Sequence, residues 1–184
     1  MTQYKELYKL VLLGESYSGK SAIAMRLSEG VYNKHYVQTI GLDYHSHIIR
    51  LDNCDDVKIQ FWDTGGNKNY LPIITSYISG VAGGIFTIDL TSLTSINNIE
   101  FWIKKFNSLN NKKVPKLLVG TKSDSENRVI TTEEAKETAD KFGCEYMECS
   151  AKKDENIYEI FKYITEKINE NSKNNITCGK KICH

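Results

Sequence analysis

The segment from Gly14 to Ser21 places the tightest restriction on how this chain folds. Its sequence, Gly-Glu-Ser-Tyr-Ser-Gly-Lys-Ser, fits the pattern G-x-x-x-x-G-K-[ST]. Glycines let a backbone turn so tightly that several N–H groups point toward one centre, and such loops bind phosphate groups. The apolar run Leu10–Leu13 predicts a buried strand before the loop, and residues 22–27 predict a helix after it. The segment therefore predicts a strand–loop–helix unit with a phosphate site at its turn.

Length and composition narrow the class of protein further. A chain of 184 residues suits one domain with a sizeable core. The 24 basic and 23 acidic side chains argue against a general nucleic-acid binder, which should carry a basic excess. No apolar run approaches the length of a membrane span, and residues 1–9 do not read as a secretory signal. Because the five cysteines also lack zinc-ligand spacing, we expect reduced thiols in a cytoplasmic protein.

Strand-like and helix-like segments alternate along the chain. Strands are expected at residues 7–13, 43–50, 57–62, 83–89, 116–120 and 145–148, and helices at 20–28, 96–106, 131–143 and 157–168. The turn at 52–56 leaves no room for a helix, so the strands beside it should form an antiparallel hairpin. The sequence therefore predicts an α/β fold with a six-stranded, mostly parallel sheet, one antiparallel edge strand and helices on both faces.

Polar residues near the carboxyl ends of these strands suit a nucleotide, because ligands of such sheets bind there. Asp63 follows an apolar strand and can hold Mg²⁺ through water, and Gly66 allows close approach to a phosphate. The Asp124 carboxylate suits the N1–H and 2-amino groups of guanine, a donor pair that adenine lacks. Thr39, in a long loop at 30–41, has a hydroxyl suited to Mg²⁺. Viewed singly, each of these residues fits an ordinary turn or solvated loop at least as well as a nucleotide site.

The order and spacing of these segments together resemble the small GTPase superfamily over about residues 7–170. Thr39-Ile40-Gly41-Leu42-Asp43-Tyr44 resembles the Rab switch I signature T-I-G-V-D-F. Residues 58–64, K-I-Q-F-W-D-T, are similar to the Rab run K-L-Q-I-W-D-T, and residues 76–80 partly match S-Y-Y-R-G. The resemblance implies a three-layer P-loop G domain at residues 1–170. From residue 170 the sequence turns polar and loses its helical period, which predicts a flexible tail at 171–184. The resemblance further implies a monomeric GTP/GDP switch that acts in vesicle trafficking on the cytosolic face of an endomembrane.

The resemblance also implies which residues form the site. Lys20 and Asn67 are the implied catalytic residues, and Ser21, Thr39 and Asp63 are the implied Mg²⁺ ligands. The implied contacts of GTP or GDP are Glu15, Ser16, Tyr17, Ser18, Gly19, Lys20, Ser21, Ala22, Tyr32, Thr39, Gly66, Thr121, Lys122, Asp124, Ser150, Ala151 and Lys152. Effectors, exchange factors and GTPase-activating proteins are the implied partners. Effectors would contact an aromatic triad of Tyr44, Trp62 and Tyr77, although these residues fit core aromatics equally well.

Asn67 departs from the family pattern, which has a glutamine that orients the attacking water. The asparagine side chain is one methylene shorter and so falls about 1.5 Å short. A misplacement of about 1 Å can cost on the order of 100-fold in rate. We therefore expect slow hydrolysis, with two alternatives: a pseudo-GTPase that binds partners without efficient hydrolysis, and a plain turn residue at position 67.

Further departures affect the loop, the base site and the tail. Tyr17 is bulky where the family prefers small residues, and Thr121 replaces the usual asparagine of N-K-x-D. The tail carries Cys178 and Cys183 but does not match C-a-a-X, so membrane attachment depends on lipidation that no standard pattern predicts. The rival for the whole chain is another P-loop enzyme such as a nucleotide kinase, against which the segment Lys122–Asp124 argues.

Overall fold

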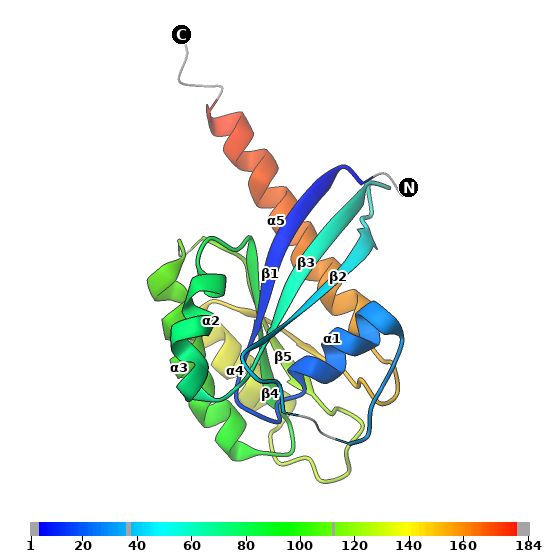
Figure 1. Cartoon of the computed structure of the whole chain (residues 1–184), viewed down its shortest axis with the longest axis vertical. Coiled ribbons are helices and arrows are strands. Elements are labelled where there is room, and N and C mark those ends of the chain that lie inside the picture. Colours follow the sequence, from blue (N-terminus) through cyan, green and yellow to red (C-terminus); the bar gives the residue numbers. More distant parts are fainter. Residues whose placement is uncertain (1–3, 36–37, 112, 180–184) are drawn as a thin grey trace.

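The computed structural model describes residues 4–35, 38–111 and 113–179, with side chains described as far as residue 173 (Figure 1). Its strands are β1 (Glu6–Leu13), β2 (Leu42–Arg50), β3 (Asp56–Thr64), β4 (Gly83–Asp89), β5 (Lys116–Thr121) and β6 (Glu145–Glu148). Its helices are α1 (Lys20–Glu29), α2 (Leu71–Ile78), α3 (Leu93–Leu109), α4 (Thr132–Phe142) and α5 (Ile157–Gly179), and a short 3₁₀ turn, η1 (Lys68–Tyr70), precedes α2.

The six strands form one sheet in the order β2-β3-β1-β4-β5-β6. Strand β2 pairs antiparallel with β3 at one edge, and the other neighbouring pairs are parallel. The predicted fold class is therefore confirmed, including the single antiparallel strand at the edge. Parallel pairing brings the carboxyl ends of β1, β3, β4, β5 and β6 to the same edge, where the functional loops begin.

Helices cover both faces of the sheet (Figure 1). The strand pleat sends successive side chains to opposite faces. In β1, Leu10 and Leu12 pack with α1 and α5, whereas Val11 and Leu13 pack with α2, α3 and α4. All four side chains are fully buried. The apolar run before the phosphate loop is thus continuous because β1 is covered on both sides.

Local signals fix the ends of two helices. Helix α1 begins directly after Gly19 and ends at Gly30, and both glycines adopt left-handed backbone angles. Helix α4 begins with the predicted capping box, in which Thr131 and Glu134 bond to each other's backbone N–H groups. Gly143 ends this helix at φ 62°. These caps satisfy backbone groups that the helix itself leaves unpaired.

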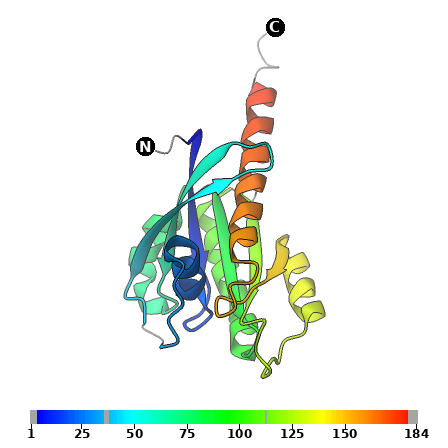
Figure 2. The same ribbon diagram turned by 90° about the vertical axis from the view of Figure 1, so that its right-hand side faces the viewer.

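Several element boundaries differ from the sequence predictions. No sequence pattern predicted η1 or α2, whose residues 68–78 come shortly after the glycine pair Gly65-Gly66. Strand β3 continues to Thr64, so Asp63 lies within the strand rather than after it. Helix α5 continues to Gly179, past the predicted loss of helical period near residue 170, and extends beyond the end of the sheet (Figure 2). The division into a domain and a flexible tail stays a prediction, and Cys183 lies outside the described residues.

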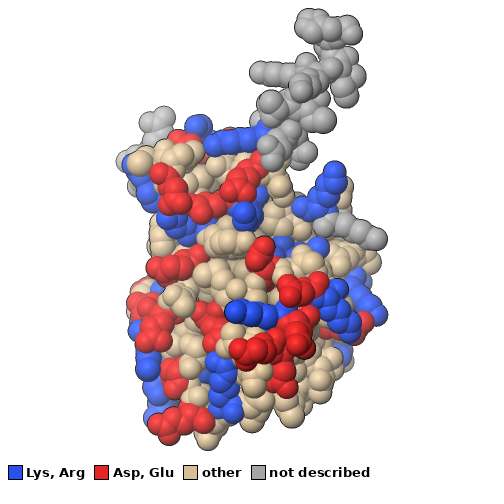
Figure 3. Space-filling view, turned by 180° about the vertical axis from the view of Figure 1, so that it is seen from behind, with Lys and Arg blue, Asp and Glu red and all other residues tan. Residues whose placement is uncertain are grey.

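The surface and the thiols add little restriction on function. On the face in Figure 3, basic side chains are interspersed with acidic ones. Among the residues described, no helix is both long enough and apolar enough to cross a membrane. Cys54, Cys144 and Cys149 are free thiols, and burial raises the pKa of Cys144 to about 11 and that of Cys149 to about 12. Such buried thiols are unreactive because the thiolate is the nucleophile.

Candidate nucleotide-binding site

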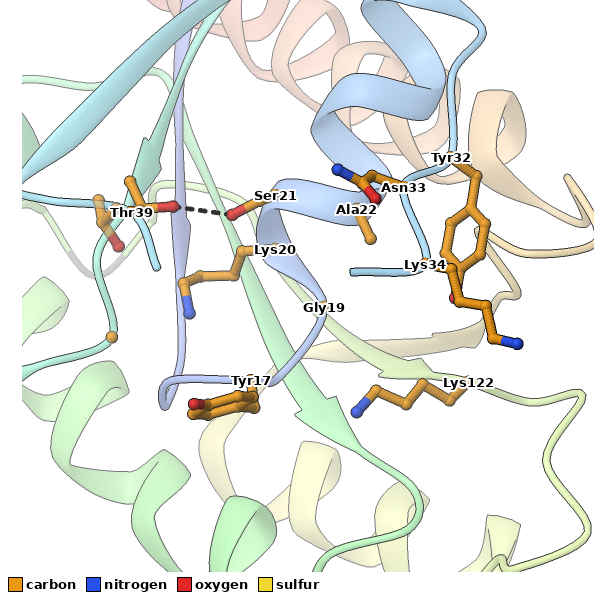
Figure 4. A pocket seen from close by; sticks show the side chains of 12 residues that line it. Tyr17, Gly19, Lys20, Ser21, Ala22, Tyr32, Asn33, Lys34, Thr39 and Lys122 are labelled. Atoms are coloured by element: carbon orange, nitrogen blue, oxygen red, sulfur yellow. Dashed lines mark hydrogen bonds between the residues drawn. The ribbon is translucent and has the colours of Figure 1, made fainter. Parts of the chain in front are cut away.

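Loops from the carboxyl edge of the sheet surround two adjoining cavities. One encloses about 190 Å³ beside the phosphate loop, and the other encloses about 390 Å³ beside the loops that follow β5 and β6. Gly19, Ala22, Tyr32 and Lys122 line both, so the two cavities adjoin and form one continuous cleft. Its two halves match the two ends of a nucleotide, one lined by phosphate-binding groups and one by groups suited to a base. Figure 4 shows the residues that line its phosphate half.

Lys20 lies at the start of α1 under the phosphate loop. Its ammonium group donates to the carbonyl oxygens of Gly14 at 3.0 Å and Glu15 at 2.7 Å. Only 4% of the residue is exposed, and this burial lowers the pKa of Lys20 to about 8, against the attraction of Asp63 and Glu15. An anionic phosphate beside Lys20 would favour the charged ammonium form, so the site is suited to phosphate.

Three oxygen ligands gather beside Lys20. The Ser21 hydroxyl donates to Asp63 Oδ2 at 2.6 Å, and the Thr39 hydroxyl lies 3.1 Å from the same oxygen. The two hydroxyls are 2.9 Å apart (Figure 4). The structure thus brings together all three predicted Mg²⁺ ligands, from α1, the long loop and β3.

Asp63 carries an unsatisfied buried oxygen. Within the described part of the chain its Oδ1 has no hydrogen-bond partner, although the residue is fully buried. Burial raises the pKa of the Asp63 carboxyl, with Ser21 and Lys20 acting in the opposite direction. A buried carboxylate that lacks a partner fits a cation or its bound water. One carboxylate with two hydroxyls suits Mg²⁺, which keeps several waters and takes further ligands from phosphates.

Two glycines bring the end of β3 against the neighbouring loops. A Cβ atom on Gly66 would lie 2.1 Å from the backbone nitrogen of Ser16 in the phosphate loop. A Cβ atom on Gly65 would lie 2.6 Å from the carbonyl oxygen of Thr39. Both distances are shorter than real contacts, so only glycine fits this arrangement. The phosphate loop, the long loop and the segment after β3 therefore meet at their backbones.

The base half of the cleft is built on Asp124. The Ser150 hydroxyl donates to Asp124 Oδ1 at 2.6 Å, and the Lys152 ammonium lies 3.6 Å from Oδ2. The hydrogen bond from Ser150 is the main reason that the pKa of Asp124 is lowered, so the carboxyl stays ionised. Ala151 and Lys152 line the same cavity. The carboxylate predicted to read guanine is thus held in place by the loop after β6.

Lys122 and Thr121 connect the base loop with the rest of the site. The Lys122 ammonium donates to Asp89 Oδ2 at 2.5 Å. The Thr121 hydroxyl lies 2.9 Å from the carbonyl oxygen of Ser18, so it contacts the phosphate loop. Asp89, which was not predicted from the sequence, also accepts hydrogen bonds from the backbone N–H and the hydroxyl of Thr91. The one sequence feature that could have identified Asp89 is its position at the end of an apolar strand, where ligands of such sheets bind.

The two tyrosines of the site lie at its surface. Tyr17 has φ 67° and is 61% exposed, and it lines the phosphate half (Figure 4). Tyr32 lines both halves, and the Arg26 guanidinium lies 5.8 Å from its ring centroid. Arg26 also donates to the Ala151 carbonyl oxygen at 2.9 Å, so α1 is joined to the base loop.

Three other predicted site residues have their side chains engaged by neighbouring parts of the protein. Ser18 is buried and its hydroxyl lies 2.6 Å from that of Thr87, whereas the Glu15 side chain leaves the cleft and accepts from the Trp102 indole at 3.1 Å. Asn67 does not line either cavity; its Oδ1 accepts from the Asn69 N–H at 2.9 Å and caps η1. The turn role that the sequence left open for Asn67 is therefore present in the structure.

The aromatic triad lies on the outside of the hairpin and α2. The Trp62 ring lies tilted against that of Tyr44 and edge-on to that of Tyr77, with ring centroids 5.0 Å and 4.9 Å apart respectively. Tyr44 is 48% and Tyr77 is 39% exposed, so the cluster is not a buried core. Ile40 and Ile73 are also exposed large apolar residues near these segments in sequence.

The phosphate loop, the sheet order and the two-part cleft define a P-loop α/β protein of the G-domain class. The Ras family model matches residues 9–170. Ras-related protein SEC4 of Saccharomyces cerevisiae is 37% identical over 181 residues, which cover 96% of this chain and 84% of that relative. Ras-related protein RABD2b of Arabidopsis thaliana is 38% identical over 167 residues, covering 90% and 82%, and Ras-related protein Rab-1 of Theileria parva is 34% identical over 172 residues, covering 92% and 78%. The chain belongs to the Ras family and is a Rab-like small GTPase.

Proposed function

We propose that this protein is a Rab-like switch that binds GTP and GDP with Mg²⁺, hydrolyses GTP slowly and recruits effectors in vesicle trafficking. The observation that carries this proposal is the continuous cleft, which joins a phosphate loop and an oxygen-ligand cluster to a carboxylate suited to guanine. The curated relatives, which are named as Ras-related, Rab or GTP-binding proteins, support the same assignment.

In this proposal the phosphate half holds the β- and γ-phosphates. Backbone N–H groups of residues 15–22 and the ammonium of Lys20 contact the phosphate oxygens, as a phosphate loop does. Ser21 and Thr39 would ligate Mg²⁺, and Asp63 would hold it through water. Bound Mg²⁺ neutralises charge that develops on the phosphate oxygens. Gly66, whose lack of a side chain permits backbone contact, would offer its N–H to the γ-phosphate.

The base half selects guanine in the same proposal. Asp124 would accept from N1–H and the 2-amino group, and the adenine of ATP has no such pair of donors to offer it. Lys122, aligned by Asp89, would lie along the base, while Ala151 would offer a backbone N–H to the guanine carbonyl. Ser150 and Lys152 keep Asp124 ionised and placed, and Tyr32 would cover the base or ribose. Thr121 contributes by joining the base loop to the phosphate loop.

Asn67 is the residue on which the rate of hydrolysis depends. It would have to orient the attacking water, but its amide oxygen is engaged by the Asn69 N–H and its side chain is short. Both features favour a slow reaction, and they also favour the second candidate, a pseudo-GTPase that binds partners without efficient hydrolysis. The two candidates differ only in whether bound GTP is converted to GDP.

Partners and location follow from the same assignment. Tyr44, Trp62 and Tyr77 would contact effectors, and exchange factors and GTPase-activating proteins would act on the segments around Thr39 and Asn67. We propose a monomer in the cytoplasm, held on the cytosolic face of an endomembrane if Cys178 or Cys183 is lipidated. The Cys178 side chain and Cys183 lie outside the part of the chain whose side chains are described.

The test is the nucleotide retained after purification, followed by single-turnover hydrolysis of loaded GTP. Guanine nucleotide in a one-to-one ratio and a slow conversion to GDP are expected. Retained GTP that is not hydrolysed would favour the pseudo-GTPase. Preferential binding of ATP in a competition titration would instead support the kinase alternative and contradict the role of Asp124.

A further inference from the structure

The backbone of Glu15 lies in the phosphate loop, whereas its side chain points away from the cleft. The carbonyl oxygen of Glu15 accepts from Lys20 at 2.7 Å. Its carboxylate oxygen Oε1 accepts from the Trp102 indole of α3 at 3.1 Å, and the Lys68 ammonium lies 3.9 Å from the same oxygen. One residue of the phosphate loop therefore contacts the phosphate-binding lysine, α3 and the segment that follows β3.

The Lys68 ammonium has a second favourable neighbour on α3. It lies 4.5 Å from the centroid of the Phe101 ring, within the range of a cation–π contact. The Phe101 ring in turn packs edge-to-face on Trp102, with ring centroids 5.3 Å apart. Trp102 is fully buried, so the ring beneath Lys68 rests on a fixed part of the core. The carboxylate and the ring thus form a dock for one cation.

Lys68 is the first residue of η1 and directly follows Asn67. Gly66, on the other side of Asn67, is packed against the backbone of Ser16. We propose that Lys68 is a positioning residue, whose ammonium group, held between the Glu15 carboxylate and the Phe101 ring, fixes the start of η1 and with it Asn67 against the phosphate loop. The segment is then held at two points, by a backbone contact before Asn67 and by a charge contact after it.

The dock depends on charge and should respond to salt. Lys68 is 46% exposed and Glu15 is 22% exposed at the side chain, so dissolved ions reach the pair. Exposed pairs of this kind and exposed cation–π contacts are individually weak, and their loss should change local opening by roughly 3- to 10-fold. Local opening of η1 is therefore the quantity to measure, rather than global unfolding.

Amide hydrogen exchange of Asn69, Tyr70 and Leu71 tests the dock on the protein as purified. Lys68→Met removes the charge and keeps an apolar stem, and it should raise exchange of these amides roughly 3- to 10-fold. Glu15→Gln keeps an acceptor for the Trp102 indole but removes the carboxylate charge, and it should have a similar effect. The double variant should exchange no faster than the faster single variant, because Lys68→Met already removes the ammonium group that the Glu15 carboxylate contacts.

Matched controls separate charge from general disturbance. Lys68→Arg keeps a cation that suits both the carboxylate and the ring, so exchange should stay at the wild-type value. Lys104→Met removes a lysine of α3 that pairs with Glu100 instead, and it should also leave η1 unchanged. Added salt should speed exchange of η1 in the wild type but not in Lys68→Met. Unchanged exchange in both Lys68→Met and Glu15→Gln, or equal acceleration in Lys68→Arg, would overturn the dock.

The consequence for Asn67 rests on the proposed function and is measured separately. Lys68→Met should lower single-turnover GTP hydrolysis by a similar factor without changing GDP affinity, and Lys68→Arg should restore it. Faster exchange with unchanged hydrolysis would show that the dock exists but does not position Asn67. Absence of hydrolysis in the wild type would count against the proposed function, while the exchange result would still decide the dock.

Discussion

Asp124 is held by Ser150 at 2.6 Å and lies 3.6 Å from Lys152, so its two oxygens have fixed directions. Asp124→Asn would replace an acceptor by an amide that donates, which suits xanthine better than guanine. We expect the preference for GDP over XDP to reverse, as measured by competition binding. Asp52→Asn, in the β2–β3 turn far from the cleft, should leave the preference unchanged. An unaltered preference in Asp124→Asn would remove this residue from the base site.

Asn67 carries the prediction on rate. If its short side chain misplaces water, wild-type hydrolysis should be slower than the Ras value of roughly 3–5 × 10⁻⁴ s⁻¹. Asn67→Gln should then accelerate it by perhaps 10-fold, or about 1.4 kcal/mol of barrier. GTP affinity should hardly change, because the residue acts on water and not on the bound nucleotide.

The measurement is the rate of single-turnover GTP hydrolysis at saturating Mg²⁺ for the wild type and for Asn67→Gln. In the wild type the Asn67 side chain accepts a hydrogen bond from the Asn69 N–H and so caps η1. The variant replaces this capping side chain with the longer one of glutamine. A wild-type rate at or above the Ras value would contradict the claim of slow hydrolysis. No acceleration in Asn67→Gln would mean that another residue limits the reaction, such as Tyr17, which is bulky where the family prefers small residues.

At this scale, sequence identified residues that a local motif specifies and missed those that only the fold brings together. Lys20, Ser21 and Asp63 stand at fixed distances from glycines and strand ends, so their convergence was predictable. The contact of Glu15 with Trp102 joins residues 87 positions apart and has no local pattern. Trp102 reads as one more apolar position of a helix, which explains why the dock for Lys68 was not foreseen.

Among the elements, α4 offers a prediction on stability. Thr131 and Glu134 satisfy two backbone N–H groups at its start, and loss of such a cap typically costs about 0.5–2 kcal/mol. Thr131→Ala should lower the free energy of unfolding by roughly 1 kcal/mol, measured by urea denaturation at fixed GDP and Mg²⁺. Thr131→Ser, which keeps the hydroxyl, serves as the control. Equal destabilisation in both variants would show that the cap is not the cause.

Element existence was predictable wherever periodicity and end signals agreed. The capping box and Gly143 defined α4, and the short turn at 52–56 required the hairpin. Residues 68–78 gave no comparable signal, because the segment begins after a glycine pair and its helix is only eight residues long. Its helical form depends on packing, with Ile74 and Ile78 fully buried against the core. Tertiary contacts thus decided what local sequence did not.

For the molecule as a whole, bound nucleotide and Mg²⁺ should stabilise the fold by mass action. Ligand at about 100 times its Kd adds about 2.7 kcal/mol. Chelation of Mg²⁺ with EDTA, followed by removal of nucleotide, should therefore lower the Tm by roughly 5–10 °C. The measurement is thermal unfolding with and without added GDP and Mg²⁺. Addition of ATP in place of GDP should not restore the Tm, and an equal recovery with both nucleotides would contradict guanine selection.

Trp102 gives the molecule an optical reporter that requires no label. Its indole donates to a carboxylate of the phosphate loop, and the chain has one other tryptophan, Trp62, on the outer face of the hairpin. With Trp62 replaced by phenylalanine, the emission wavelength and intensity would come from a single ring that is hydrogen-bonded to the phosphate loop. Exchange of GDP for GTP would then be followed in real time as a change in tryptophan fluorescence, in the otherwise unmodified chain.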